Sequence, residues 1–235
     1  MGDFRFKRFT VHNERSAMKV NTDGVLLGAS VSLRSGRVLD IGTGTGTIAL
    51  IIAQRTDEAG LSSVITGIDI DPASAEEAGC NFAGSPWPDR LDALCCSLGD
   101  YSPDGKFDLI VSNPPYYDNS LQNPDERESA ARHNISLSYR EVLEFAAENL
   151  SEAGLAALVL PADTEKSLLR EARSRGLFPQ RILRIRTTPK KETSRIIAEF
   201  SSGRVDTKEE ALTIQDGGAY TSEYISLVRD FYEKM

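Results

Sequence analysis

Hydrophobic and polar positions in the middle of the chain follow two alternating patterns. Short apolar runs, each about as long as a strand, are separated by longer segments whose apolar residues recur at helical spacing. The apolar runs, which read as buried strands, are residues 37–41, 64–69, 91–96, 107–112 and 154–161. The helical segments are residues 47–55, 72–83, 138–150 and 163–175. Because short buried strands alternating with helices form parallel sheets, this order predicts an α/β fold with helices on both faces.

The pattern changes toward the carboxyl terminus. Residues 179–188 and 194–202 are strand-like runs with no helix between them, and strands joined by a short connection pair antiparallel. Residues 222–235 then read as a final helix. The complete pattern predicts a Rossmann-like, mostly parallel sheet of seven strands with an antiparallel edge strand.

We expect a single domain made of three segments. Residues 1–36 form an amino-terminal extension, a hairpin followed by a helix capped by Thr22 or Asp23. Residues 37–202 form the ligand-binding core. Residues 203–235 form a carboxyl-terminal extension of strand and helix.

Charge narrows the classes of partner. The net charge of −8 is opposite in sign to that of a general nucleic-acid-binding protein. Residues 165–204 nevertheless hold eleven basic side chains against four acidic ones. This stretch fits either a local contact with nucleic acid or a solvated basic surface.

Membrane, secretory and metal-binding classes find no support in the residues. No run of 18 apolar residues occurs, so no transmembrane helix is expected, and the charged amino terminus is unlike a secretory signal. The 3 Cys and 2 His lack metal-ligand spacing. We therefore expect no metal, a cytoplasmic location, and Cys95 and Cys96 as small core side chains.

A glycine-rich turn, IGTGTG, separates the first core strand from its helix. Gly42, Gly44 and Gly46 allow positive φ angles and close approach of a ligand to backbone N–H groups at the helix start. A dinucleotide fingerprint would carry Gly or Ala where this chain has Thr47. NAD is therefore disfavoured as the ligand of this turn. A second alternative is that the turn binds no ligand.

Three carboxylates stand at strand ends near this turn. Asp40 would repel a pyrophosphate but suits a ligand with an ammonium group. Asp69 ends the next strand, 27 residues after Gly42, where an acid can bind both ribose hydroxyls. Asp100 follows the third strand and can accept a hydrogen bond from an adenine amine, or cap a turn. Together they favour S-adenosylmethionine, with S-adenosylhomocysteine as product, over NAD.

The fourth strand is followed by SNPPYYDNS, an unusual sequence for a strand exit. Two prolines stiffen the segment and prevent further sheet pairing. The motifs DIGTGTG, GIDIDP, GDY and NPPY resemble those of class I S-adenosylmethionine-dependent methyltransferases that modify a planar nitrogen. The resemblance implies that the Asn113 side chain and the Pro114 carbonyl accept both hydrogens of the target nitrogen. It also implies that Tyr116 stacks on the target ring.

A narrower resemblance extends over most of the chain. FRFKRFTV, MKVNTDGVLLGA, NPPYY, ARH and SRIIAEF are similar to segments of the bacterial tRNA1(Val) (adenine(37)-N6)-methyltransferases. That family carries Gly where this chain has Asn21, and Lys where it has Ser194. The resemblance implies an adenine in the anticodon loop of tRNA as substrate, no obligate protein partner, and Lys19 near the methionine carboxylate. The expected RNA contacts are Arg132, His133, Arg184, Arg186, Lys190 and Lys191.

Other substrates and another class stay open. A glutamine in a protein release factor would be methylated by the same chemistry, but those enzymes usually carry a helical domain ahead of the glycine turn. Adenine N6 or guanine N2 in rRNA is a further possibility. A non-catalytic module that binds RNA or S-adenosylmethionine is disfavoured by the intact NPPY motif.

Overall fold

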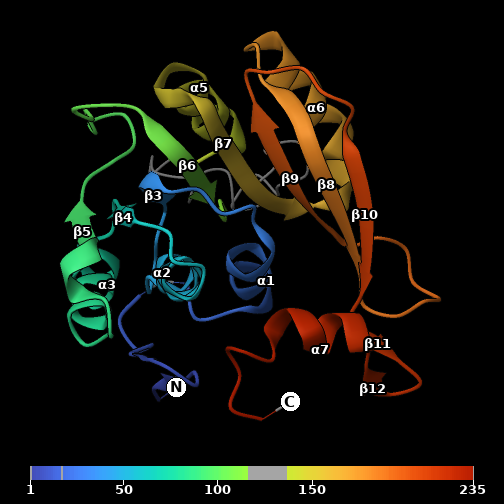
Figure 1. Cartoon of the computed structure of the whole chain (residues 1–235), viewed down its shortest axis with the longest axis horizontal. Coiled ribbons are helices and arrows are strands. Elements are labelled where there is room, and N and C mark those ends of the chain that lie inside the picture. The colour runs from blue at the N-terminus through green and yellow to red at the C-terminus, as the bar shows by residue number, and fades with distance from the viewer. Residues whose placement is uncertain (1, 17, 116–136, 235) are drawn as a thin grey trace, which may run out of the picture.

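The computed structural model describes residues 2–16, 18–115 and 137–234. An eight-stranded sheet runs through the molecule in the order β10-β8-β9-β7-β6-β3-β4-β5 (Figure 1). Its strands are β3 (Gly36–Ile41), β4 (Ser63–Asp69), β5 (Leu91–Cys95), β6 (Phe107–Ser112), β7 (Leu150–Pro161), β8 (Phe178–Arg186), β9 (Arg195–Ser201) and β10 (Lys208–Thr213). Two short hairpins lie outside the sheet: β1 (Phe4–Arg5) with β2 (Thr10–Val11), and β11 (Gln215–Asp216) with β12 (Ala219–Tyr220).

Helices cover both faces of the sheet, as predicted. Helices α1, α2, α3 and α7 share one apolar cluster with one sheet face, whereas α5 and α6 share a second cluster with the other face (Figure 1). The bounds are α1 (Thr22–Ser30), α2 (Thr47–Glu58), α3 (Pro72–Ala83), α5 (Tyr139–Asn149), α6 (Glu165–Ser174) and α7 (Ser222–Val228). The α/β class and the mostly parallel sheet are therefore confirmed.

The sheet differs from the prediction in its strand count and in the place of its antiparallel strand. Strand β9 is antiparallel to both neighbours and lies between β7 and β8, not at an edge. The connection through α6 places β8 two positions away from β7, and β9 then returns to fill the position between them. The edge strand on this side of the sheet is β10, which pairs parallel to β8. A strand was expected within residues 203–235, but not as a member of this sheet, because KEEALT has few apolar residues, as is typical of a solvent-facing edge strand.

Two further expectations need correction. Helix α1 is capped by Asn21, whose Oδ1 accepts from the Gly24 N–H at 2.9 Å, and not by Thr22 or Asp23. Cys95 is exposed and Cys96 is only partly buried, because Cys95 ends β5, the other edge strand, and no strand among the described residues pairs with its outer side. Helix α5 begins with a capping box between Ser138 and Glu141.

The two ends of the chain pack together. Phe6 forms a β-bridge with Tyr232, and Lys7 N–H donates to the Phe231 carbonyl at 2.7 Å. Both termini accordingly lie in the same part of the molecule (Figure 1). The final helix is shorter than predicted, ending at Val228, because Phe231 and Tyr232 must turn to reach this contact. No helix among the described residues is long and apolar enough to cross a membrane.

Candidate active site

A cleft of about 750 Å³ opens at the carboxyl ends of β3, β4 and β6. These strands are neighbours, with Ile41 paired to Ile68 on one side and to Ser112 on the other. From β3 the chain continues outward to β4 and β5, whereas β6 starts the other half of the sheet. The cleft therefore lies at the switch point where open α/β sheets bind their ligands.

The glycine turn forms one wall of this cleft. Gly42, Gly44 and Gly46 all have positive φ, at 70°, 56° and 78°. Gly42 and Gly44 line the cleft, but Gly46 faces inward, where a Cβ atom would collide with the Phe82 ring. The third glycine thus allows α2 to pack closely on α3, and the first two leave space for a ligand.

Asp69 and Asp100 both line the cleft, at the ends of neighbouring strands. Asp69 accepts from the Gly44 N–H at 2.9 Å and from the Asp71 N–H at 3.0 Å. Burial raises the pKa of its carboxyl, although these hydrogen bonds oppose the shift. Asp100 accepts from the Ser97 hydroxyl at 2.6 Å. Each carboxylate oxygen can accept a further hydrogen bond, so both residues remain available to a ligand.

Asp40 lies behind the glycine turn and does not line the cleft. It is fully buried, and its Oδ2 accepts from the Thr43 hydroxyl at 2.8 Å. Its Oδ1 is buried without a hydrogen-bond partner among the described residues. Burial raises the pKa of this carboxyl to about 7. Any attraction between Asp40 and a ligand's ammonium group therefore acts through the turn and not by direct contact.

The amino-terminal segment forms the opposite wall. We call residues 13–16 and 18–20 the strap. Met18 and Lys19 of the strap line a small cavity of about 30 Å³ beside the glycine turn. The Lys19 ammonium donates to the carbonyls of Glu14 at 2.7 Å and Ser16 at 2.9 Å. A lysine has three N–H donors, so one can still reach a ligand in this cavity.

Asn113 follows β6 and lines both the cleft and the small cavity. Its side chain is 7% exposed, and its Nδ2 donates to the Met18 sulfur at 3.7 Å. Pro114 is buried beside it, and Pro115 lines the cleft. The predicted stacking residue, Tyr116, lies outside the described residues.

The predicted RNA-contacting side chains have different surroundings. Arg184 is paired with Glu165 and Glu209, whose carboxylates raise its pKa. Arg186 donates to the Thr213 hydroxyl at 2.8 Å. Lys190 and Lys191 are exposed in the turn after β8, at the same end of the strands as the cleft. Arg132 and His133 lie outside the described residues.

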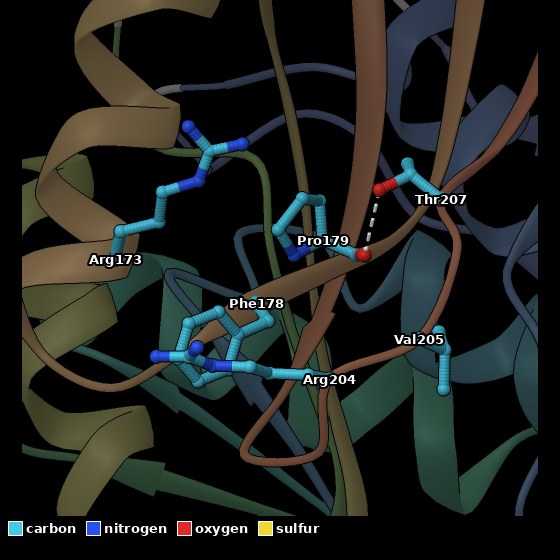
Figure 2. Close-up of a pocket in the computed structure, with 6 residues that line it drawn as sticks. All are labelled: Arg173, Phe178, Pro179, Arg204, Val205 and Thr207. Carbon is cyan, nitrogen blue, oxygen red and sulfur yellow. Dashed lines mark hydrogen bonds between the residues drawn. The ribbon is translucent and has the colours of Figure 1, made fainter.

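A second cavity, of about 420 Å³, lies at the opposite end of the strands from the cleft. Figure 2 shows Arg173 and Arg204 on one side of it, with the Arg204 guanidinium 4.4 Å from the centre of the Phe178 ring. Phe178 is the first residue of β8, so this cavity is a full strand length away from the glycine turn. Its lining holds no carboxylate, and it has no part in the cleft.

Sequence reasoning missed the apolar walls of the cleft and the strap. Met18 and Ile70 line the cleft and are 40% and 41% exposed, which is high for large apolar side chains. Exposed apolar surface inside a cleft is suited to contact with a ligand. Ile70 could have been found from its place directly after Asp69. No group of three potential metal ligands occurs among the described residues.

Comparisons with known proteins agree with this geometry. Residues 16–167 match the family model described as "Methyltransferase small domain". The fold is shared with a "predicted O-methyltransferase" from Agrobacterium tumefaciens, at a TM-score of 0.67 and 20% identity over 89% of this chain and 96% of that one. It is also shared with a type I restriction-modification methyltransferase subunit from Streptococcus thermophilus, at a TM-score of 0.62 and 13% identity over 93% of this chain and 53% of that one.

The fold and the cleft thus define a methyltransferase of the small-domain class. Closer relatives extend over the whole chain. A protein from Bacteroides fragilis is 43% identical over 99% of this chain and 98% of its own length. Another from Flavobacterium psychrophilum is 38% identical over 99% of this chain and 100% of its own. Both are named tRNA1(Val) (adenine(37)-N6)-methyltransferase, and the chain belongs to this family.

Proposed function

We propose that the protein transfers the methyl group of S-adenosylmethionine to N6 of adenine 37 in tRNA1(Val). The observation that carries the proposal is the position of Asn113, a buried amide where the cleft meets the small cavity. An amide there can face a cofactor bound along the glycine turn and a base that enters the cleft. Relatives of matching length that bear this name supply the substrate class.

The residues that line the two cavities fit S-adenosylmethionine. Asp69 would bind the ribose hydroxyls, Asp100 the adenine amine, and the third Lys19 N–H the methionine carboxylate. Ile70 would pack against the adenine, since it lies in the cleft beside Asp69. Asp40 would attract the ammonium group through the turn. When bound, the cofactor supplies a methyl group on a positively charged sulfur.

The chain's own part in the reaction is to hold the target amine. The lone pair of an exocyclic amine is delocalised into its ring, which makes it a weak nucleophile. The Asn113 Oδ1 and the Pro114 carbonyl would each accept one of its two N–H groups. These acceptors stabilise the positive charge that develops as the nitrogen becomes tetrahedral, and they orient its lone pair. The proton can leave after transfer, so no general base is needed beforehand.

The target base would have to leave its stack to reach Asn113. A base in a single-stranded loop costs less to extrude than a base in a duplex. The anticodon loop would approach the end of the strands where the cleft opens and where Lys190 and Lys191 are exposed. Arg186 and Arg184 would add to this surface, Arg184 less so because two carboxylates already neutralise it.

The test is a methylation assay with labelled S-adenosylmethionine. Unmodified bacterial tRNA, rRNA and a release factor are offered separately, and the labelled nucleosides are identified by mass spectrometry. We expect N6-methyladenosine in tRNA alone, at position 37 of the tRNA1(Val) species. Label in the release factor would replace the proposal with glutamine methylation. Label in rRNA would replace tRNA with rRNA as the substrate. Cofactor binding with no label in any sample would contradict the proposed methyl transfer.

A further inference from the structure

Glu77 of α3 is a buried carboxylate that the reaction described above does not use. It is 2% exposed. Its Oε1 accepts from the backbone N–H groups of Glu14 and Arg15, at 2.8 Å each. Its Oε2 accepts from the Ser16 N–H, also at 2.8 Å. One side chain therefore binds three consecutive amides of the strap.

The strap keeps its shape mainly through hydrogen bonds to side chains. It belongs to no helix or strand, and buried backbone groups outside such elements need side-chain partners. Glu77 supplies the acceptors for three of its N–H groups, and Lys19 supplies donors for the carbonyls of Glu14 and Ser16. The Val20 N–H donates to the Asn13 Oδ1 at 3.0 Å. A buried carboxylate is tolerated only when its oxygens are well satisfied. Glu77 and the strap thus stabilise each other.

The other side of the strap faces the cleft. Ser16 and Met18 line the cleft, and the Ser74 hydroxyl of α3 donates to the Ser16 hydroxyl at 3.1 Å. Ser16 in turn donates to the Met18 carbonyl at 3.0 Å. The Met18 sulfur accepts from the Asn113 amide. A continuous set of contacts therefore leads from Glu77 through Ser16 and Met18 to Asn113.

We propose that Glu77 is a positioning residue for methyl transfer. It fixes Ser16, Met18 and Lys19 against the cofactor, and through Met18 it holds the Asn113 oxygen toward the target nitrogen. The inference rests on the proposed function, because it assigns the strap to the same cofactor and the same acceptor. Glu77 itself touches neither of them.

The test compares Glu77→Gln with Glu76→Gln. Gln has nearly the shape of Glu, but its amide nitrogen must face at least one strap N–H, which leaves donors unsatisfied. Glu76 precedes Glu77 on α3, and its one ion pair among the described residues is with the exposed side chain of Arg15, at 2.8 Å. Its replacement removes the same charge beside the same strap and leaves the backbone contacts intact. Affinity for S-adenosylhomocysteine, amide hydrogen exchange, kcat and KM are measured for each protein.

For Glu77→Gln we expect about a tenfold loss of S-adenosylhomocysteine affinity, equivalent to about 1.4 kcal/mol. We also expect faster exchange of the amides of residues 14–16, a raised KM for the cofactor and a lowered kcat. Glu76→Gln should match the wild type within about twofold. Faster exchange without any change in affinity, KM or kcat would overturn the proposal, because Glu77 would then be purely structural.

Two further variants keep the test decisive. If Glu77→Gln fails to fold, Glu77→Asp retains the charge and shortens the reach, and the same losses are expected in weaker form. Met18→Leu keeps an apolar side chain against the cofactor but removes the sulfur acceptor, so kcat should fall several-fold and by a larger factor than cofactor affinity. An unchanged kcat would contradict the last step of the inference. A wild-type protein that fails to bind S-adenosylhomocysteine would refute the proposed cofactor instead, so the two failures are distinguishable.

Discussion

The Nδ2 atom of Asn113 lies 3.7 Å from the sulfur of Met18. A thioether sulfur accepts hydrogen bonds and cannot donate them. It therefore favours the amide orientation in which the nitrogen faces the strap and Oδ1 points away from the sulfur. The target amine needs an acceptor at this place. A residue 95 positions earlier in the chain thus helps to decide which end of the Asn113 amide serves the reaction.

The first prediction concerns Asn113 itself. Asn113→Ala should lower kcat by about 10²–10³, the usual effect of removing one preorganised group that stabilises developing charge. Affinity for S-adenosylhomocysteine should change little, because the rest of the cleft is intact. Single-turnover methylation and calorimetric binding measure the two effects. Asn149→Ala, in α5 and outside the cleft, is the control. Retention of near wild-type turnover by Asn113→Ala would remove this residue from the reaction.

The second prediction concerns the pH dependence of cofactor affinity. Burial raises the pKa of Asp40 to about 7, so this carboxyl becomes negative as the pH rises through 7. Its attraction to the ammonium group of the cofactor should appear over the same range. We expect affinity for S-adenosylhomocysteine to increase from pH 6 to pH 8 in the wild type. Calorimetric titrations should show a weaker dependence for Asp40→Asn, and equal dependences would contradict this role.

The same carboxyl makes a third prediction, on stability. Its pKa is about 7 in the folded protein, against 3.8 for an ordinary Asp. Between these values only the unfolded chain ionises, so this group's contribution to stability falls as the pH rises and is lowest above about 7. Asp40→Asn can still accept from Thr43 and should stabilise the protein at pH 8, by at most about 4 kcal/mol. Denaturant unfolding at pH 5 and pH 8 should show the larger gain at pH 8.

Much of this site follows from the sequence because its chemistry is local. The glycine turn and Asn113 come directly after apolar runs, Asp69 ends one, and Asp100 follows another after a short turn. Parallel strands bring such positions to one edge of the sheet, and these residues line one cleft. Burial of Asp40 behind the turn was not predictable, because side-chain direction within a turn depends on backbone angles.

The strap lay beyond sequence reasoning for a different reason. Its partner Glu77 binds the backbone N–H groups of residues 14–16, and Asn81 binds that of His12 directly before the strap. Contacts to a backbone leave no residue pattern in the strap. On a helix, Glu77 reads as an ordinary solvated acid. The place of β10 in the main sheet was missed for a related reason, since backbone pairing with β8 specifies it more than its side chains do.

The fourth prediction concerns RNA affinity and its dependence on salt. Lys190 and Lys191 are exposed at the end of the strands where the cleft opens. Arg173 and Arg204 are exposed at the opposite end of the strands, beside the second cavity (Figure 2). Each lysine that neutralises a phosphate should contribute about 0.9 to the slope of log affinity against log salt. The double variant Lys190→Gln/Lys191→Gln should therefore bind tRNA more weakly and lower that slope by about 1–2.

The matched control for this prediction is Arg173→Gln/Arg204→Gln. It removes the same two positive charges but leaves the cleft edge unchanged, so a general effect of net charge affects both double variants equally. Fluorescence titrations of tRNA at several salt concentrations give the slopes. A wild-type slope for the control and a reduced slope for the lysine variant would place the RNA over the cleft edge. Equal reductions in both would mean that overall charge, and not these two lysines, governs binding.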